Sequence, residues 1–152
     1  MLKYIEGSKQ YIDECTEALQ ESELGRVYFS AKDKARQAIY EGISNNELII
    51  ATDNDNDFLG FLWYIPKGAF HSFPYLHIIA VRKQYRNQGI GKMLLKYFED
   101  TICKNSEKIF LVVADFNPEA KRLYEKVGYC EVGRIPNLYK AGVCESLMMK
   151  EL

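Results

Sequence analysis

The sequence has few cysteines and histidines and no long apolar run. It contains four cysteines and two histidines, the cysteines lie far apart, and no C-x-x-C pair occurs. We therefore expect no metal site and a reduced, cytoplasmic protein whose cysteines, Cys130 and Cys144 among them, are small core residues. No apolar run approaches the roughly 18 residues of a membrane span. The N-terminal residues show no apolar segment of the kind found in signal peptides. We expect no membrane partner.

Excess charge is also absent. The formal net charge is −1 at pH 7, with 20 basic and 21 acidic residues, so no global positive field favours nucleic acid as a partner. Any basic site must be local. The 152 residues are 47% hydrophobic and 27% charged, an ordinary globular balance without repeats or low-complexity segments. These values predict one domain over residues 1–152.

Apolar spacing and turn residues predict the order of the secondary-structure elements. Helices are expected at residues 8–20, 30–41, 90–102 and 117–128. Strands are expected at residues 47–52, 58–65, 75–81, 109–114, 129–134 and 143–151. Ser30 is the expected cap of the second helix, Asn117 that of the last helix, and residues 21–30 are expected to form a loop. The strand–helix–strand unit from Tyr75 to Ala114 should be parallel with a right-handed crossover, flanked by antiparallel hairpins.

The segment RNQGIGK, Arg86 to Lys92, joins the third predicted strand to a helix. It matches neither a P-loop nor the three-glycine fingerprint of dinucleotide-binding folds. A helix N-terminus offers free N–H groups and partial positive charge, and glycine lacks the Cβ that would keep a ligand away. Phosphate or diphosphate is the natural ligand of such a site. A plain glycine turn with solvated Arg and Lys gives the same pattern, so this reading also stays open.

The longer run IAVRKQYRNQGIGKMLL resembles motif A of the GNAT acyl-CoA N-acetyltransferase superfamily, whose signature [QR]-x-x-G-x-[GA] is matched by residues 86–91. The later block FNPEAKRLYEKVGY resembles the family's motif B. The element order is similar over nearly the whole chain. The resemblance implies a GNAT-like α/β (α+β) domain. Its sheet is mixed, mostly antiparallel and of about six to seven strands, with a central parallel pair that splays apart and helices on both faces.

The resemblance also implies acetyl-CoA as co-substrate, without a metal. Its diphosphate is expected on the main-chain N–H groups of residues 87–92, and its pantetheine arm along the third predicted strand. Asn117 is expected to hold the arm near the acyl end. The expected cofactor-binding residues are Ile79, Ala80, Val81, Arg86, Asn87, Gln88, Gly89, Ile90, Gly91, Lys92, Asn117 and Tyr124.

Two side chains are candidates for proton transfer. Tyr124 falls on the family's general-acid position, where a phenol of pKa ~10 can protonate a departing thiolate, although its helical spacing also suits a core tyrosine. His77 is similar to a strand histidine of aralkylamine N-acetyltransferases. An imidazole of pKa ~6.5 can accept the proton of an amine, directly or through water. A histidine satisfied inside the sheet is the alternative.

The resemblance therefore implies an N-acetyltransferase whose acceptor, a primary amine of a small molecule, attacks acetyl-CoA directly in a ternary complex. Tyr28, Phe29 and Tyr139 are expected to line the acceptor pocket. Alternatives are a protein or peptide N-terminal or lysine acetyltransferase and a non-catalytic acyl-CoA-binding module. Enzymes that acetylate ribosomal proteins place a glutamate base where this chain has Val112, which disfavours that branch. The resemblance also leaves room for a homodimer.

Overall fold

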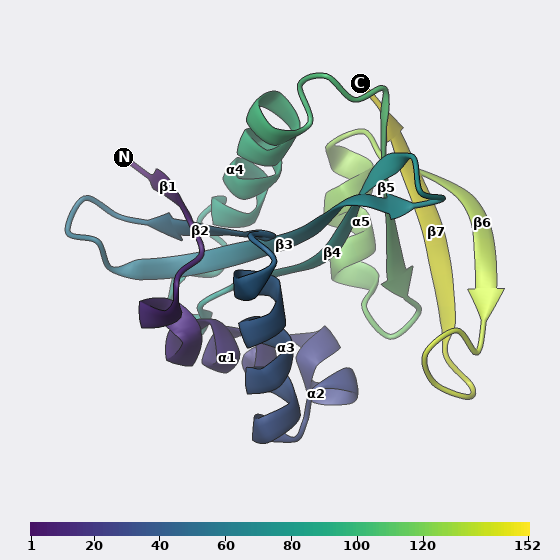
Figure 1. The fold of residues 1–152 in the computed structure, drawn as a ribbon. Coiled ribbons are helices and arrows are strands. Elements are labelled where there is room, and N and C mark those ends of the chain that lie inside the picture. Colours follow the sequence, from purple (N-terminus) through teal and green to yellow (C-terminus); the bar gives the residue numbers. More distant parts are fainter.

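One sheet of seven strands runs through the structure, and helices cover both of its faces (Figure 1). This computed structural model describes all residues, 1–152. The strands are β1 (Lys3–Glu6), β2 (Leu48–Thr52), β3 (Phe58–Ala69), β4 (Phe73–Val81), β5 (Lys108–Ala114), β6 (Cys130–Pro136) and β7 (Cys144–Glu151). The helices are α1 (Ile12–Glu21), α2 (Glu23–Tyr28), α3 (Lys32–Ser44), α4 (Ile90–Tyr97) and α5 (Pro118–Lys126). Shorter helical segments are η1 (Lys9–Tyr11), η2 (Lys83–Tyr85) and the π-helical turn η3 (Phe98–Ile102).

The strand order across the sheet is β1-β2-β3-β4-β5-β7-β6. Every neighbouring pair is antiparallel except β4 and β5 in the middle. The parallel pair is in register only where Tyr75 meets Phe110 and Leu76 meets Leu111. Beyond these residues the strands separate toward their C-terminal ends. The predicted mixed sheet with a splayed central pair is confirmed.

A β-bulge at His77 reverses the facing of side chains along β4. Trp63 of β3 pairs with Ile78 and Tyr64 pairs with Leu76, so His77 has no partner on β3. Leu76 belongs to the core cluster that contains α4 and α5 residues, whereas Ile78 belongs to the cluster that contains α1 and α3 residues. A bulge bends its strand and leaves the extra residue unpaired. Here it lies beside the point where β4 leaves β5.

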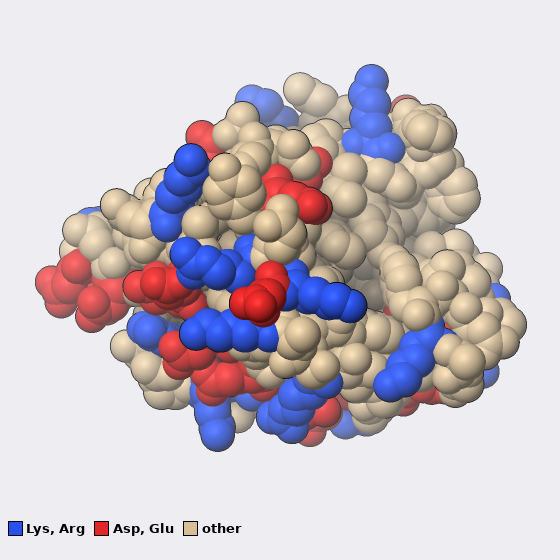
Figure 2. All heavy atoms as spheres, turned by 60° about the horizontal axis from the view of Figure 1, so that its bottom comes forward, with Lys and Arg blue, Asp and Glu red and all other residues tan.

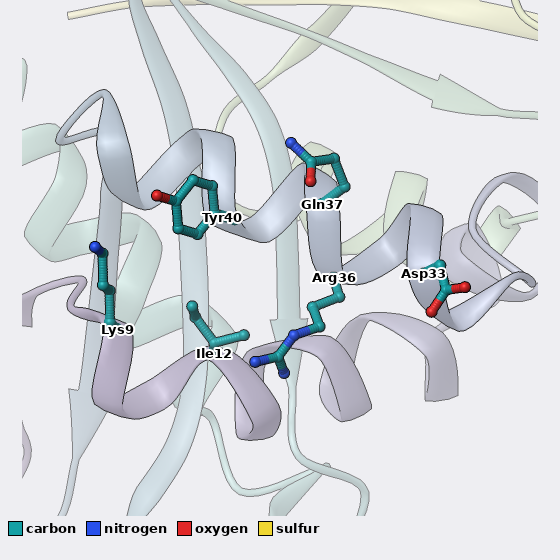
Figure 3. A pocket seen from close by; sticks show the side chains of 6 residues that line it. All are labelled: Lys9, Ile12, Asp33, Arg36, Gln37 and Tyr40. Atoms are coloured by element: carbon teal, nitrogen blue, oxygen red, sulfur yellow. The ribbon is translucent and has the colours of Figure 1, made fainter.

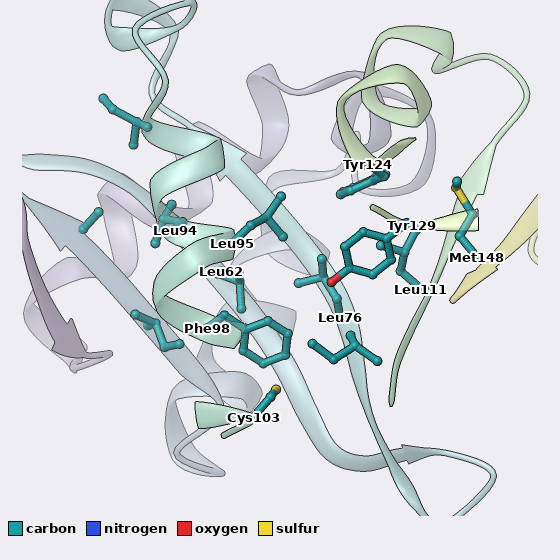
Figure 4. Close-up of a cluster of buried hydrophobic side chains, with 14 of the residues drawn as sticks. Leu62, Leu76, Leu94, Leu95, Phe98, Cys103, Leu111, Tyr124, Tyr129 and Met148 are labelled. Atoms are coloured by element: carbon teal, nitrogen blue, oxygen red, sulfur yellow. The ribbon is translucent and has the colours of Figure 1, made fainter. Parts of the chain in front are cut away.

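Two apolar cores hold the helices against the sheet, one on each face. On the α4–α5 face, Leu94 and Phe98 are fully buried, and Figure 4 shows them beside Leu62, Tyr124 and Tyr129. Fully burying a side chain of that size contributes about 1.5–3 kcal/mol to folding. The α1–α3 face is held in the same way by residues such as Leu19, Ile39 and Phe61.

Two of the elements were not predicted from the sequence. The first strand, β1, was not expected, and residues 23–28 form the helix α2 instead of a loop. The hydroxyl of Ser22 caps α2 by accepting a hydrogen bond from the N–H of Gly25 (3.0 Å). A Cβ on Gly25 would lie 1.6 Å from the carbonyl oxygen of Leu19, so only glycine lets α2 begin this close to the end of α1.

Three smaller predictions are wrong. Helix α3 begins at Lys32 with Ala31 as its cap and no side-chain cap bond, so Ser30 is not the cap. Strand β3 continues past residue 65 as far as Ala69. Cys15 and Cys103 are buried as expected, but Cys130 is exposed and Cys144 half-buried. Cys130 is exposed because β6 is an edge strand whose exposed residues face no helix. Cys144 is half-buried as the first residue of β7, where that strand begins after the β6–β7 loop.

Neither acidic nor basic side chains dominate the face that carries α1 to α3. Figure 2 shows acidic and basic side chains intermingled over these helices and a broad uncharged area beside them. None of the helices combines the length and the apolar character needed to cross a membrane.

Candidate functional site

The turn before α4 presents a row of free main-chain donors. The N–H groups of residues 87–92 have no main-chain acceptor, and the next one, of Met93, donates to the carbonyl of Gly89 (3.1 Å). Asn87 and Gly89 have positive φ values, 63° and 80°. Left-handed residues in such a turn aim successive N–H groups at one point and form an anion-binding concavity. The N-terminus of α4 adds its partial positive charge.

Arg86 anchors this turn. Its Nε donates to the carbonyl of Val81 (3.2 Å) and its Nη2 donates to the carbonyl of Glu21 (2.8 Å). The guanidinium therefore ties the turn to the end of β4 and to the end of α1. A fixed turn keeps its donors pointed at the same place whether or not a ligand is bound, which reduces the entropy lost on binding.

Two connected hollows begin at this turn. The loop hollow, of about 540 Å³, lies in front of it, and the central cleft, of about 170 Å³, lies between β4 and β5. Every residue that the sequence analysis assigned to acetyl-CoA lines one of the two, except Gln88. The two hollows share Ser22, Ile79, Val81, Gly91, Asn117, Ala120 and Leu123.

The central cleft suits an extended, partly apolar chain. Beyond Leu76 and Leu111 the strands β4 and β5 have no register pairs, so the main-chain groups that face the gap are available to a ligand. The walls are mostly aliphatic, with Ile79, Val113 and Leu123 among them. Together with the free N–H groups, this fits an anionic head and an amide-bearing arm, the two parts that coenzyme A presents.

Tyr124 reaches the central cleft from α5. It is 8% exposed, and burial raises the pKa of its phenol above the ordinary value of 10, so the hydroxyl is protonated at neutral pH. Its ring packs edge-on against Tyr129, with centroids 5.9 Å apart (Figure 4). The hydroxyl of Tyr129 donates to Glu99 (3.2 Å), which is paired with Lys150 (2.6 Å). Tyr124 thus lines the central cleft and carries a protonated hydroxyl at neutral pH.

His77 lies where the central cleft meets the opposite face of the sheet. Its ring packs edge-on against Trp63, with centroids 4.7 Å apart. Burial lowers the pKa of the imidazole below 6.5, so the ring is neutral at pH 7 and can accept a proton. No hydrogen bond in the structure engages its side chain, which leaves its nitrogen free for a substrate or a water.

A third hollow opens on the α1–α3 face. This tyrosine hollow, of about 280 Å³, is lined by Leu24, Tyr28, Phe29, Tyr75, His77, Ile78, Val112, Tyr139 and Glu145. The three residues expected at the acceptor pocket, Tyr28, Phe29 and Tyr139, therefore lie together. The rings of Tyr28 and Tyr139 are 5.6 Å apart, and the hydroxyls of Tyr75 and Tyr139 are 3.3 Å apart.

Sequence reasoning missed two residues of the tyrosine hollow. Tyr75 was not among the residues expected at the acceptor pocket, yet its hydroxyl lies 3.3 Å from that of Tyr139. Glu145 was not considered, although a glutamate inside the apolar run of β7 is the signal that could have identified it. It is 3% exposed and accepts a hydrogen bond from the hydroxyl of Tyr28 (2.7 Å).

Other hollows lack comparable chemistry. One of about 490 Å³ lies between α1 and α3, where Arg36 is paired with Asp13 and the ammonium of Lys9 lies over the ring of Tyr40 (Figure 3). Another, of about 410 Å³, adjoins the tyrosine hollow through Tyr75 and Tyr139 and has mostly apolar walls. No group of three or more His, Cys, Asp or Glu side chains is placed to hold a metal ion.

Part of this chain is similar in sequence to known proteins. An uncharacterized N-acetyltransferase of Methanocaldococcus jannaschii is 38% identical over 79 residues, 49% of this chain and 51% of that protein. An N-alpha-acetyltransferase of Sulfurisphaera tokodaii is 37% identical over 76 residues, 49% of this chain and 46% of that protein. The chain thus spans about half the length of these relatives.

Solved structures extend the likeness to the whole fold. The crystal structure of Ard1 from Thermoplasma volcanium superposes with a TM-score of 0.81 at 20% identity, covering 99% of this chain and 97% of that one. Residues 12–129 match the model of the acetyltransferase (GNAT) family. That match includes the turn before α4, both strands of the central cleft and Tyr124. The chain therefore belongs to the acetyltransferase (GNAT) family.

Proposed function

We propose that this acetyltransferase moves the acetyl group of acetyl-CoA to a primary amine of a small molecule, by direct attack within a ternary complex. The observation that carries the proposal is the meeting of two hollows. The central cleft and the tyrosine hollow share Leu24, His77, Ile78 and Val112, so a ligand in each would touch the other at the gap between β4 and β5.

The residues of the loop hollow and the central cleft fit acetyl-CoA. The N–H groups of residues 87–92 would hold its diphosphate, the gap-facing edge of β4 at Ile79 to Val81 would pair with its pantetheine arm, and Asn117 would contact the arm where the hollows join. Acetyl-CoA supplies an activated acyl group as a thioester. Main-chain N–H groups near Ile79 would stabilise negative charge that develops on the carbonyl oxygen.

Two side chains of this protein would move the protons. An amine of pKa ~10 is protonated at neutral pH and must lose that proton before it can attack. His77 would accept it, directly or through a water, because its imidazole is neutral and opens to both hollows. Tyr124 would donate to the leaving sulfur from the cleft. Holding both reactants side by side accounts for much of the acceleration.

The walls of the tyrosine hollow favour a small acceptor. Tyr139 comes from the β6–β7 loop, and its contacts with Tyr28 and Tyr75 close that side of the hollow. The β6–β7 loop is itself held by a hydrogen bond from the N–H of Gly142 to Asn137 Oδ1 (2.8 Å).

A peptide acceptor is the second candidate. The 410 Å³ hollow beyond Tyr139 and the likeness to an N-alpha-acetyltransferase favour it.

An acceptor panel tests the proposal. Purified protein with acetyl-CoA is expected to acetylate small primary amines with higher kcat/KM than peptides that carry a free N-terminus or a lysine. Release of coenzyme A, measured with a thiol reagent, gives the rate, and mass spectrometry identifies the product. Turnover of peptides but not of polyamines, arylalkylamines or aminoglycosides would reverse the order of the two candidates. Binding of acetyl-CoA without turnover of any amine would favour a non-catalytic module.

Gly91→Val is expected to weaken coenzyme A binding by on the order of 10-fold or more, about 1.4 kcal/mol or greater. A Cβ at position 91 meets only ordinary contacts, Leu123 at 3.8 Å and Val81 at 4.0 Å, so the fold should persist while the side chain occupies the shared wall of the hollows. Isothermal calorimetry measures the affinity. Met93→Val, on the same helical turn but 44% exposed, is the matched control and should bind normally. Equal affinity in both variants would place coenzyme A elsewhere.

Tyr124→Phe is expected to lower kcat by about 100-fold or more and to leave acetyl-CoA affinity nearly unchanged, because only a proton donor is removed. Steady-state kinetics and calorimetry provide the two values. Tyr129→Phe removes a hydroxyl from the ring packed against Tyr124 without touching the cleft, so its kcat should stay close to that of the parent. An unaltered kcat in Tyr124→Phe would assign this residue to the core alone.

The pH dependence of kcat/KM is expected to show an acid limb below pH 6.5. Burial lowers the pKa of His77, so the imidazole is neutral above that pKa and becomes protonated, and unable to accept a proton, as the pH falls through it. The limb should disappear in His77→Asn. The other histidine, His71, supplies the control, because it lies in the β3–β4 turn and lines none of these hollows. His71→Asn should therefore keep the acid limb. Profiles that superimpose for the parent and His77→Asn would exclude His77 as the base.

A further inference from the structure

Glu145 is a buried carboxylate without a cationic partner. Its side chain takes part in none of the ion pairs of the structure, and its one hydrogen bond comes from the hydroxyl of Tyr28, 2.7 Å from Oε2. Ala114 of β5 and Ile135 of β6 flank it in the sheet. The side chain therefore cannot turn to solvent at a sheet edge, and it faces the tyrosine hollow.

An arrangement of this kind is unfavourable in the free protein. A buried carboxylate loses its hydration, and one phenol hydrogen bond replaces only part of it. Burial, and after it the negative charge of Asp115, raises the pKa of Glu145 above the ordinary carboxyl value, while the bond from Tyr28 opposes that rise. Because this pKa is higher in the folded state than in the unfolded state, the fold favours the protonated carboxyl. The free energy of unfolding therefore decreases as the pH rises through the folded pKa and Glu145 ionises. Glu145 thus costs stability at neutral pH.

The surroundings of Glu145 are suited to a positive charge that the protein does not itself supply. No lysine or arginine is among the nine residues that line the tyrosine hollow. Tyrosine rings line it instead, and aromatic faces attract ammonium groups. Asp115, whose carboxylate accepts from the N–H of Cys144 (3.2 Å), adds a second negative charge nearby. A cationic ligand would complete the site.

We propose that Glu145 determines acceptor specificity by binding a second, non-reacting cationic group of the amine substrate. This inference rests on the proposed function and names the acceptor class, amines that carry two or more positive charges. The reacting amine would lie at His77, where the tyrosine hollow meets the central cleft, and the second cation would lie between Glu145 and the rings of Tyr28 and Tyr139.

The second cation, and not the reacting one, is the group that Glu145 suits. A carboxylate in contact with an ammonium stabilises its charged form and raises its pKa. Holding the reacting amine in this way would oppose the loss of the proton that attack requires. A distal ammonium has no such requirement, and the carboxylate then contributes binding without hindering the chemistry.

The experiment compares α,ω-diamines of increasing chain length with n-alkylamines of the same length as acceptors for the parent, Glu145→Gln and Glu151→Gln. In the parent, kcat/KM for the best diamine should exceed that for its matched monoamine by about 10-fold or more, as expected for a charge-assisted contact in a buried site. Glu145→Gln should abolish this preference by lowering kcat/KM for the diamine toward that for its matched monoamine. Glu151→Gln carries the same change at the exposed end of β7 and should keep the preference.

Binding is measured alongside turnover, by calorimetry of the same diamines on protein saturated with coenzyme A. The parent should bind the diamine more tightly than the monoamine, and Glu145→Gln should bind both alike. Because glutamine keeps the shape of the side chain and removes an unpaired charge, Glu145→Gln should fold and be at least as stable to denaturant at pH 7. Lower stability of this variant would contradict an uncompensated charge and overturn the inference.

The two proposals fail in different ways. Equal kcat/KM for mono- and diamines in the parent, or an equal loss for both in Glu145→Gln, would overturn the role of Glu145 while acetyl transfer to amines stands. Absence of turnover with every amine would overturn the proposed function instead. The calorimetric comparison would still decide whether Glu145 binds a cation.

Discussion

The rest of the site depends on the incomplete pairing of β4 and β5. Two parallel strands that share only two register pairs leave a gap in the middle of a seven-stranded sheet. Unpaired main-chain groups inside a protein are costly, so such a gap persists only where something else holds the strands. Here β3 and β7 hold the outer edges of β4 and β5, and an apolar core on each face fixes the helices that border the gap.

Different polar groups reach the gap from the two faces of the sheet. On the α4–α5 face lie the turn with free N–H groups and the phenol of Tyr124, and on the α1–α3 face lie the tyrosine hollow and Glu145. The bulge at His77 places an imidazole between them. Among these groups Glu145 is buried without a cationic partner and therefore costs stability at neutral pH, a condition that is frequent at functional sites.

Much of this could be predicted from local sequence. The turn from Arg86 to Lys92 depends on positive φ at Gly89 and on the helix that follows, and both are properties of a few neighbouring residues. Prediction failed at two places for different reasons. Helix α2 begins where Ser22 caps it and Gly25 fits under the carbonyl of Leu19, a local fit that does not depend on apolar periodicity. Cys130 is exposed because β6 is an edge strand, which the pairing of distant segments decides. Neither fact is visible in the spacing of apolar residues.

The sequence by itself determined the family, the mixed sheet and the row of main-chain donors, because motif, periodicity and turn chemistry act over short distances. Only the tertiary structure decided how the tyrosine hollow is built. Tyr28, Tyr75, Tyr139 and Glu145 come from α2, β4, the β6–β7 loop and β7, and no local pattern links them. The physical reason is that the burial of Glu145 and its lack of a cation depend on which elements pack around it, and strand order sets that arrangement.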